Sequence, residues 1–190
     1  TTIICLLLGY PAAYIMAMAD FKTPQVMAML FILPMWINFL LRTIATVELF
    51  RMFGLPLGEG ALLFGMVYDF LPFMIYPIYN TLQKMDTSLI EAAHDLGAKR
   101  SQVFMKVTLP LSVPGIYSGI VMVFMPTVST FAIAELLTHN KVTLFGSLIQ
   151  RCFGEGGIAM WNYGAALSLI MLIIIGLTSF FGGDKEDINR

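Results

Sequence analysis

The stretch Ser88-Leu-Ile-Glu-Ala-Ala-His-Asp-Leu-Gly97 is the one long polar segment between hydrophobic runs in this chain. Ser88 and Glu91 have the spacing of a capping box, in which the two side chains satisfy free amides at a helix start. Gly97 can adopt the positive φ that commonly closes a helix. The stretch therefore predicts a short helix that begins at Ser88 and ends at Gly97.

The sequence after Gly97 predicts a second short helix. Ser101 is a suitable N-cap residue, and the helix would run through Lys106. Leu109-Pro110 would end it and open the next hydrophobic segment, because proline cannot continue the helical hydrogen-bond ladder. Residues 84–108 would then form one polar loop between two hydrophobic segments.

The composition of the whole chain indicates a membrane protein. Of the 190 residues, 58% are hydrophobic and only 12% are charged, with a mean hydropathy of +0.81, which leaves too little polar surface for a water-soluble globule. The formal net charge of −1 gives no reason to expect a nucleic-acid partner. Cys5, Cys152, His94 and His139 lack the spacing of a metal site.

Five runs carry at most one charge and approach or exceed the roughly 20 residues that cross a hydrocarbon core as a helix. Backbone amides in lipid must be satisfied within the segment, which favours helices. We expect an all-α polytopic membrane bundle in one domain, residues 1–190. The chain opens with Thr1 inside an apolar run, so we also expect one further N-terminal helix to precede it. The five runs are residues 1–19, 23–41, 60–83, 107–134 and 156–183.

The distribution of Lys and Arg predicts the orientation. If the five runs cross in turn, seven basic residues fall on one side and four on the other, and the richer side is expected to be cytoplasmic. The polar loop 84–108 then faces the cytoplasm. The first group is Lys22, Lys84, Lys99, Arg100, Lys106, Lys185 and Arg190, and the second is Arg42, Arg51, Lys141 and Arg151.

Glu91-Ala92-Ala93, Gly97 and Val107-x-Leu109-Pro110 together resemble the EAA loop of binding-protein-dependent ABC importer permeases. Val107 stands where that family usually has isoleucine, a change that keeps the β-branched apolar character. The resemblance covers nearly the whole chain and implies the type I importer fold in a bacterial inner membrane. It also implies that the chain is not an enzyme and binds no cofactor of its own, because ATP is used by a partner. The implied partners are a pair of cytoplasmic ATPase subunits, a second related permease and an extracytoplasmic substrate-binding protein.

In such permeases the loop helix docks in a cleft of the ATPase and couples nucleotide-driven closure to alternating access. The resemblance therefore implies an ATPase-coupling set with electrostatic support from its two basic members. The alternative is a solvated loop whose basic residues meet anionic lipid headgroups. The coupling set is Glu91, Ala92, Ala93, Gly97, Lys99 and Arg100.

Two further motifs, Gly65-Met-Val-Tyr68 and Leu71-Pro-Phe-Met74, resemble the membrane subunits of spermidine/putrescine importers, as does the segment 38–43. This resemblance implies that the solute is a small cation, with polyamine as the expected substrate. Permeases for ferric iron, thiamine and opines share parts of the pattern and remain alternatives.

Asp69 is the only charged residue inside the third hydrophobic run. A carboxylate within a span costs roughly 2.5 to 3.5 kcal/mol on insertion scales and so usually faces protein or water. Asp69 and Tyr68, with Glu135, are candidates for a cation path that uses charge pairing and cation–π attraction. Alternatively, Asp69 is hydrated near the outer interface or pairs with Arg42 or Arg51.

Two other classes of function fit the sequence less well. An intramembrane enzyme needs a nucleophile and a base, and neither HExxH nor a Gly-x-Ser-Gly paired with a span histidine occurs. A secondary transporter often shows an inverted internal repeat, which is not evident, and it would leave the EAA-like loop unexplained.

Overall fold

The computed structural model describes residues 1–18, 29, 31, 33–139, 141–154 and 157–183, with the side chains of 157–159 and 180–183 left aside. Every regular element within these ranges is helical. The elements are α1 (Thr2–Met18), the 3₁₀ turn η1 (Leu33–Trp36), α3 (Phe39–Met52), α4 (Glu59–Gln83), α5 (Thr87–Asp95), α6 (Arg100–Val103), the π turn η2 (Phe104–Thr108), α7 (Leu109–Ser129), α8 (Ala132–Thr138), α9 (Phe145–Gly154) and α10 (Gly157–Gly183).

Three helical stretches in the described residues are long and apolar enough to cross a membrane. They are α4, the continuous helix 100–129 and residues 160–179 of α10, while α1 is apolar and 17 residues long. Large hydrophobic side chains are exposed along α1 and α10, as expected of surfaces that meet lipid. The prediction of an all-α membrane bundle is confirmed.

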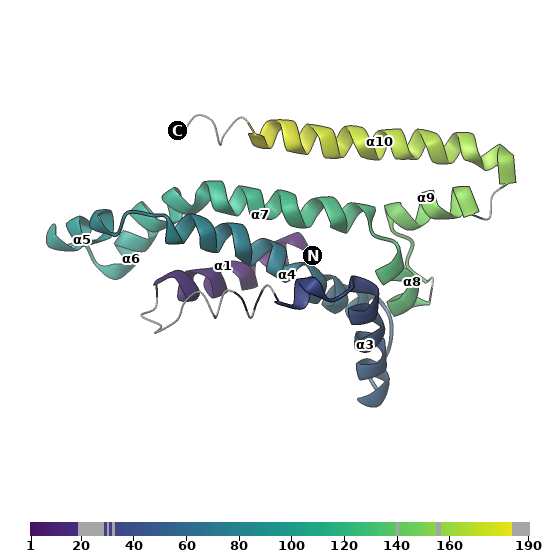
Figure 1. Cartoon of the computed structure of the whole chain (residues 1–190), viewed down its shortest axis with the longest axis horizontal. Coiled ribbons are helices and arrows are strands. Elements are labelled where there is room, and N and C mark those ends of the chain that lie inside the picture. The colour runs from purple at the N-terminus through teal and green to yellow at the C-terminus, as the bar shows by residue number, and fades with distance from the viewer. Residues whose placement is uncertain (19–28, 30, 32, 140, 155–156, 184–190) are drawn as a thin grey trace.

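The long helices lie side by side, with α4 between α1 and α7 and with α10 along the other side of α7 (Figure 1). The helix pair α5–α6 forms one end of the molecule, and α3, α8 and α9 gather at the opposite end (Figure 1). Lys99 and Arg100 lie at the end formed by α5 and α6, and Arg42 and Arg51 lie in α3 at the opposite end. Lys22, Lys185 and Arg190 lie outside the described residues.

Small residues on α7 allow it to approach α4 closely. A Cβ on Gly115 would lie 2.5 Å from Oγ1 of Thr81 and 2.9 Å from the carbonyl oxygen of Pro77. A Cβ on Gly119 would lie 2.8 Å from Sδ of Met74. Glycines four residues apart on one helix face are a common device for close helix packing in membranes.

The predicted second span, residues 23–41, does not continue as one helix to its end. Residues 19–28, 30 and 32 lie outside the described residues. In the described part, η1 surrounds Pro34, and the Asn38 side chain then accepts a hydrogen bond from the Leu40 amide at 2.8 Å. This cap starts α3, so residues 39–41 belong to a new helix.

The breaks in the long helices do not fall at their internal prolines. Pro72 and Pro77 lie inside α4, which stays helical over all 25 residues. The span predicted at 107–134 breaks instead after Ser129, where Thr130 is extended, with φ −68° and ψ 142°, before α8 begins at Ala132.

Candidate functional site

The EAA-like segment forms the helix α5, and Asp86 caps its start. Oδ1 of Asp86 accepts a hydrogen bond from the Ser88 amide at 2.9 Å, so α5 begins at Thr87 and the predicted capping box at Ser88 is wrong. Both residues are good caps, and the earlier one takes the role. Hydrogen bonds from the side chain of Ser88 and then from its amide lower the pKa of Asp86.

Gly97 ends α5 as the sequence predicted. Its φ is +79°, and the Gly97 amide donates to the His94 carbonyl at 2.8 Å, while the Ala98 amide donates to the Ala93 carbonyl at 3.1 Å. These two bonds are those of a Schellman motif, which needs a residue with positive φ at this position. The motif turns the chain sharply from α5 into α6.

The return path from this turn to the membrane is helical throughout. Gln102 accepts a hydrogen bond from the Lys99 amide at 2.9 Å, so α6 begins at Arg100 and Ser101 is not its cap. In η2 the Leu109 amide donates to the Phe104 carbonyl, a π-type bond one residue longer than the α-helical one. This turn precedes Pro110, and the helix continues through the point where the sequence predicted a break.

An apolar stripe on α5 is exposed at this end of the molecule. Leu89, Ala92 and Leu96 lie on one helix face at intervals of three and four residues, and Leu96 is 88% exposed. Glu91, Lys99 and Arg100 are exposed as well, whereas Ala93 is half-buried. Sequence reasoning missed Leu89 and Leu96, although their spacing of seven residues is the signal of a helix face.

The structure brings two of the six predicted coupling residues together in one hollow. Ala93 and Gly97 line a hollow of about 330 Å³ between α5 and the following helical turn, while Ala92 and Glu91 lie on the exposed faces of α5. The hollow and the apolar stripe meet at Leu96. The other lining residues are Ala98, Gln102, Val103, Lys106 and Val107.

Asp69 lies at the other end of the bundle and is paired within the protein. Its side chain is 1% exposed and that of Arg42 is 6% exposed, with 3.3 Å between Nε of Arg42 and Oδ1 of Asp69. The single hydroxyl proton of Thr43 is shared between the Phe39 carbonyl oxygen, at 2.9 Å, and Oδ2 of Asp69, at 3.2 Å. Asp69 therefore pairs with Arg42, one of the two predicted alternatives. This ion pair links α3 to α4.

Tyr68 and Glu135, the other two residues predicted for the cation path, are more accessible than Asp69. The guanidinium of Arg42 lies 5.7 Å from the ring centroid of Tyr68, close enough for a cation–π contact. Glu135 is exposed on α8. Within the described part of the chain, no three His, Cys, Asp or Glu side chains gather as a metal site would require.

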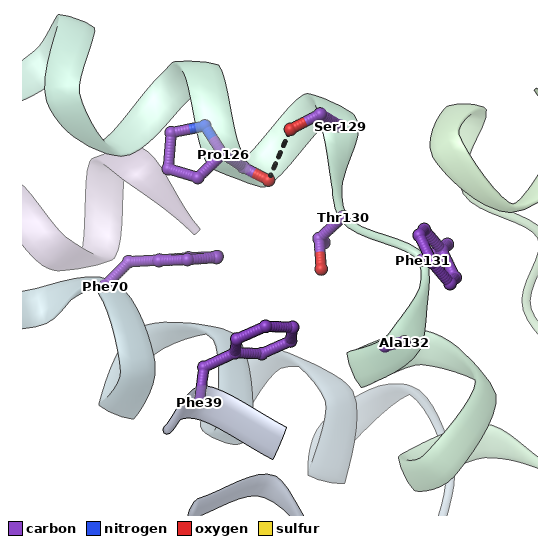
Figure 2. Close-up of a pocket in the computed structure, with 7 residues that line it drawn as sticks. All are labelled: Phe39, Phe70, Pro126, Ser129, Thr130, Phe131 and Ala132. Atoms are coloured by element: carbon purple, nitrogen blue, oxygen red, sulfur yellow. Dashed lines mark hydrogen bonds between the residues drawn. The ribbon is translucent and has the colours of Figure 1, made fainter. Parts of the chain in front are cut away.

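Near the Arg42–Asp69 pair lies an aromatic cavity of about 260 Å³ that sequence reasoning did not anticipate. Figure 2 shows the rings of Phe39 from α3 and Phe70 from α4 facing the end of α7, with Phe131 on the far side of Thr130. The break after Ser129 opens this space, because the chain leaves α7 there in extended form. The remaining lining residues are Pro126, Ser129 and Ala132.

The membrane bundle thus ends in an exposed helix pair, of which α5 is capped at both ends. The family described as "Binding-protein-dependent transport system inner membrane component" matches residues 9–183. The chain belongs to this family. Its members are membrane components of transport systems that work with a separate binding protein, as the description says.

Individual relatives are similar over most of the chain. The "Spermidine/putrescine transport system permease protein PotB" of Escherichia coli K12 is 35% identical over 193 residues, covering 93% of this chain and 70% of the relative. The protein of the same name from Haemophilus influenzae is 36% identical over 196 residues, covering 94% and 68%.

A solved structure has the same fold. A chain of the MetNI methionine ABC transporter, in inward-facing conformations, superimposes with a TM-score of 0.73 and 20% identity, covering 96% of this chain and 86% of that one. The expected type I importer fold is confirmed.

Proposed function

We propose that this chain is the membrane permease subunit of an ATP-driven importer for polyamines, with spermidine or putrescine as the solute. The relatives named for spermidine/putrescine transport support this substrate class at 35% and 36% identity over nearly the whole chain. Residues 1–190 then act as one transmembrane domain. A pair of ATPase subunits, a second permease and a binding protein complete the importer.

The observation that carries the coupling part of the proposal is the exposed stripe on α5. Leu89 and Leu96 expose apolar side chains on a short helix that protrudes from the bundle, and a protein partner would remove these side chains from water. The Schellman turn at Gly97 fixes the angle at which α5 meets the rest of the chain. In the proposal α5 sits in a cleft of the ATPase.

The predicted coupling residues take separate roles in this arrangement. Ala92 lets the partner approach the helix closely, and Ala93 with Gly97 shapes the hollow beside it. Glu91, Lys99 and Arg100 supply charges around the apolar contact, where they set the orientation of the partner more than the affinity. Closure of the ATPase pair would move α5 and bias the bundle between its inward-open and outward-open states.

Substrate-stimulated ATP hydrolysis tests the substrate class. The chain is reconstituted in proteoliposomes with its second permease and ATPase, and spermidine, putrescine, ferric iron and thiamine are each added with the matching binding protein. We expect a polyamine with its binding protein to stimulate ATP hydrolysis, and ferric iron and thiamine to have no effect. Stimulation by ferric iron or thiamine instead would overturn the polyamine assignment and leave the importer assignment standing.

Co-purification of the ATPase tests the coupling site. We expect Gly97→Pro and Glu91→Lys variants, expressed at normal yield, to lose the ATPase during purification. A complex of normal stoichiometry in both variants would contradict docking at α5. Uptake that continues with ATP after proton and sodium gradients are abolished would exclude the secondary-transporter alternative.

A further inference from the structure

We propose that the aromatic cavity is a transit site for an alkylammonium group of the transported cation. The inference rests on the proposed function and adds to it the residues that would hold the charge. The cavity lies at the end of the bundle opposite α5, where the break between α7 and α8 opens the wall of the helix bundle (Figures 1 and 2).

The lining favours a cation with an apolar body. Three phenylalanine rings contribute, and a ring face attracts an ammonium group by roughly 0.5 to 2 kcal/mol, depending on desolvation. Phe70 is 8% exposed and forms a fixed wall, while Phe39 and Phe131 are 44% and 40% exposed and remain open to a ligand. Among the described residues, no Lys or Arg lines the cavity.

The polar groups of the lining are acceptors placed for a cation. The Ser129 hydroxyl donates to the carbonyl oxygens of Met125 and Pro126, at 3.1 and 3.4 Å, which leaves its own oxygen able to accept. The Thr130 hydroxyl points into the space beside Phe39 and Phe131 (Figure 2). Ser129 is also the last residue of α7, the end at which a helix carries partial negative charge.

The Arg42–Asp69 pair positions the rings without adding net charge. Arg42 follows Phe39 by one helical turn, and Asp69 directly precedes Phe70. The ion pair and the Thr43 hydrogen bond therefore hold the two aromatic walls at a fixed spacing. Asp69, which the sequence suggested as a direct ligand of the cation, acts here as a positioning residue.

Glu135 supplies a negative charge in the first turn of α8, the helix that follows Phe131 of the lining. It lies four residues after Phe131 along the chain that forms α8, and both side chains are exposed. A volume of about 260 Å³ is just below the roughly 300 to 1,000 Å³ of most small-molecule sites, which suits one end of a slender diamine. An approaching ammonium group would meet the carboxylate first and the rings second.

Protection from thiol labelling tests the site directly in the complete importer. The Ala132→Cys variant places a reporter in the lining without removing a group that contacts the cation, and the native Cys5 and Cys152 are buried. We expect putrescine to slow labelling of Cys at this position by a maleimide, and 1,4-butanediol, its uncharged analogue, to have no effect. Phe39→Leu, which keeps an apolar side chain but removes the ring, should raise the half-protecting concentration about 2- to 30-fold.

Phe53→Leu is the matched control, because Phe53 is an exposed ring at the end of α3 outside the cavity, and it should leave protection unchanged. Polyamine uptake at saturating binding protein gives an independent measurement. We expect uptake to fall in Phe39→Leu and in Phe131→Leu, and to be retained in Phe131→Trp, which keeps an aromatic ring. Equal protection by butanediol, or normal uptake in both Phe39→Leu and Phe131→Leu, would overturn the transit site and leave the proposed function standing. Failure of the unmodified importer to transport any polyamine would overturn the proposed function and this site together.

Discussion

The buried ion pair between Arg42 and Asp69 leads to a quantitative prediction about stability. At the 3.3 Å between Nε and Oδ1, two unit charges attract by about 5 kcal/mol for an effective dielectric constant of about 20. Asp69→Asn removes the charge and keeps an oxygen that accepts the Thr43 hydrogen bond. Arg42 then remains 94% buried without a counter-charge, and breaking a buried pair in this way costs about 3 to 5 kcal/mol.

Unfolding of the purified protein in mixed micelles, titrated with a denaturing detergent, measures this loss. The double variant Arg42→Met/Asp69→Leu replaces both charges by apolar groups and should return to within about 1 kcal/mol of the unmodified protein, because no buried charge is left unpaired. A double-mutant cycle then gives the coupling between the two side chains directly.

The Arg51–Glu48 pair offers a control on the same helix. Its side chains are 56% and 63% exposed, with 3.0 Å between the charged atoms, so Arg51→Met should cost no more than about 1 kcal/mol. An Asp69→Asn variant as stable as the Arg51→Met variant would refute the reasoning. A double variant that loses the full sum of the two single changes would refute it as well.

Three further predictions concern packing, docking and capping. Gly115→Ala should lower the free energy of unfolding by about 1 to 3 kcal/mol, because the new methyl group meets the backbone of α4. Gly176→Ala is the control, since the space around Gly176 is open, and it should not destabilise the protein in the same assay. Leu96→Asp should leave unfolding unchanged but abolish co-purification of the ATPase, and Leu96→Met should retain it; equal recovery of the complex in both would contradict docking on this face. The lowered pKa of Asp86 means that its cap contributes above the ordinary aspartate pKa of 3.8 and is lost only as the pH falls further, through the folded value. NMR titration of the Asp86 carboxyl should give a value below 3.8, and titration at or above 3.8 would exclude the cap in solution.

The helical class and several element limits were predictable from the sequence. The third run was expected at 60–83 and α4 spans Glu59–Gln83, because a long apolar run flanked by polar residues leaves few other choices. Gly97 was predicted as a C-cap, since few other residues tolerate a φ of +79°. These features depend on local chemistry that is written in consecutive residues.

The errors arose where two local signals competed or where tertiary contacts decide. Asp86 and Ser88 are both good caps, and spacing alone does not rank them. The sequence named Arg42 and Arg51 equally as partners for Asp69, and only the packing of α3 on α4 selects Arg42. The aromatic cavity joins residues of α3, α4 and the α7–α8 break, which no sequence periodicity connects.

The π turn at Phe104–Thr108 joins α6 to α7 without a break in the helix. Because this turn keeps the backbone helical, Arg100 to Ser129 is one helix of 30 residues, or about 45 Å at 1.5 Å per residue. Pro114 and Pro126 lie within this helix, but the backbone stays helical at both. A displacement applied near Arg100 therefore meets no break in the helix before Thr130, which lies in the wall of the aromatic cavity.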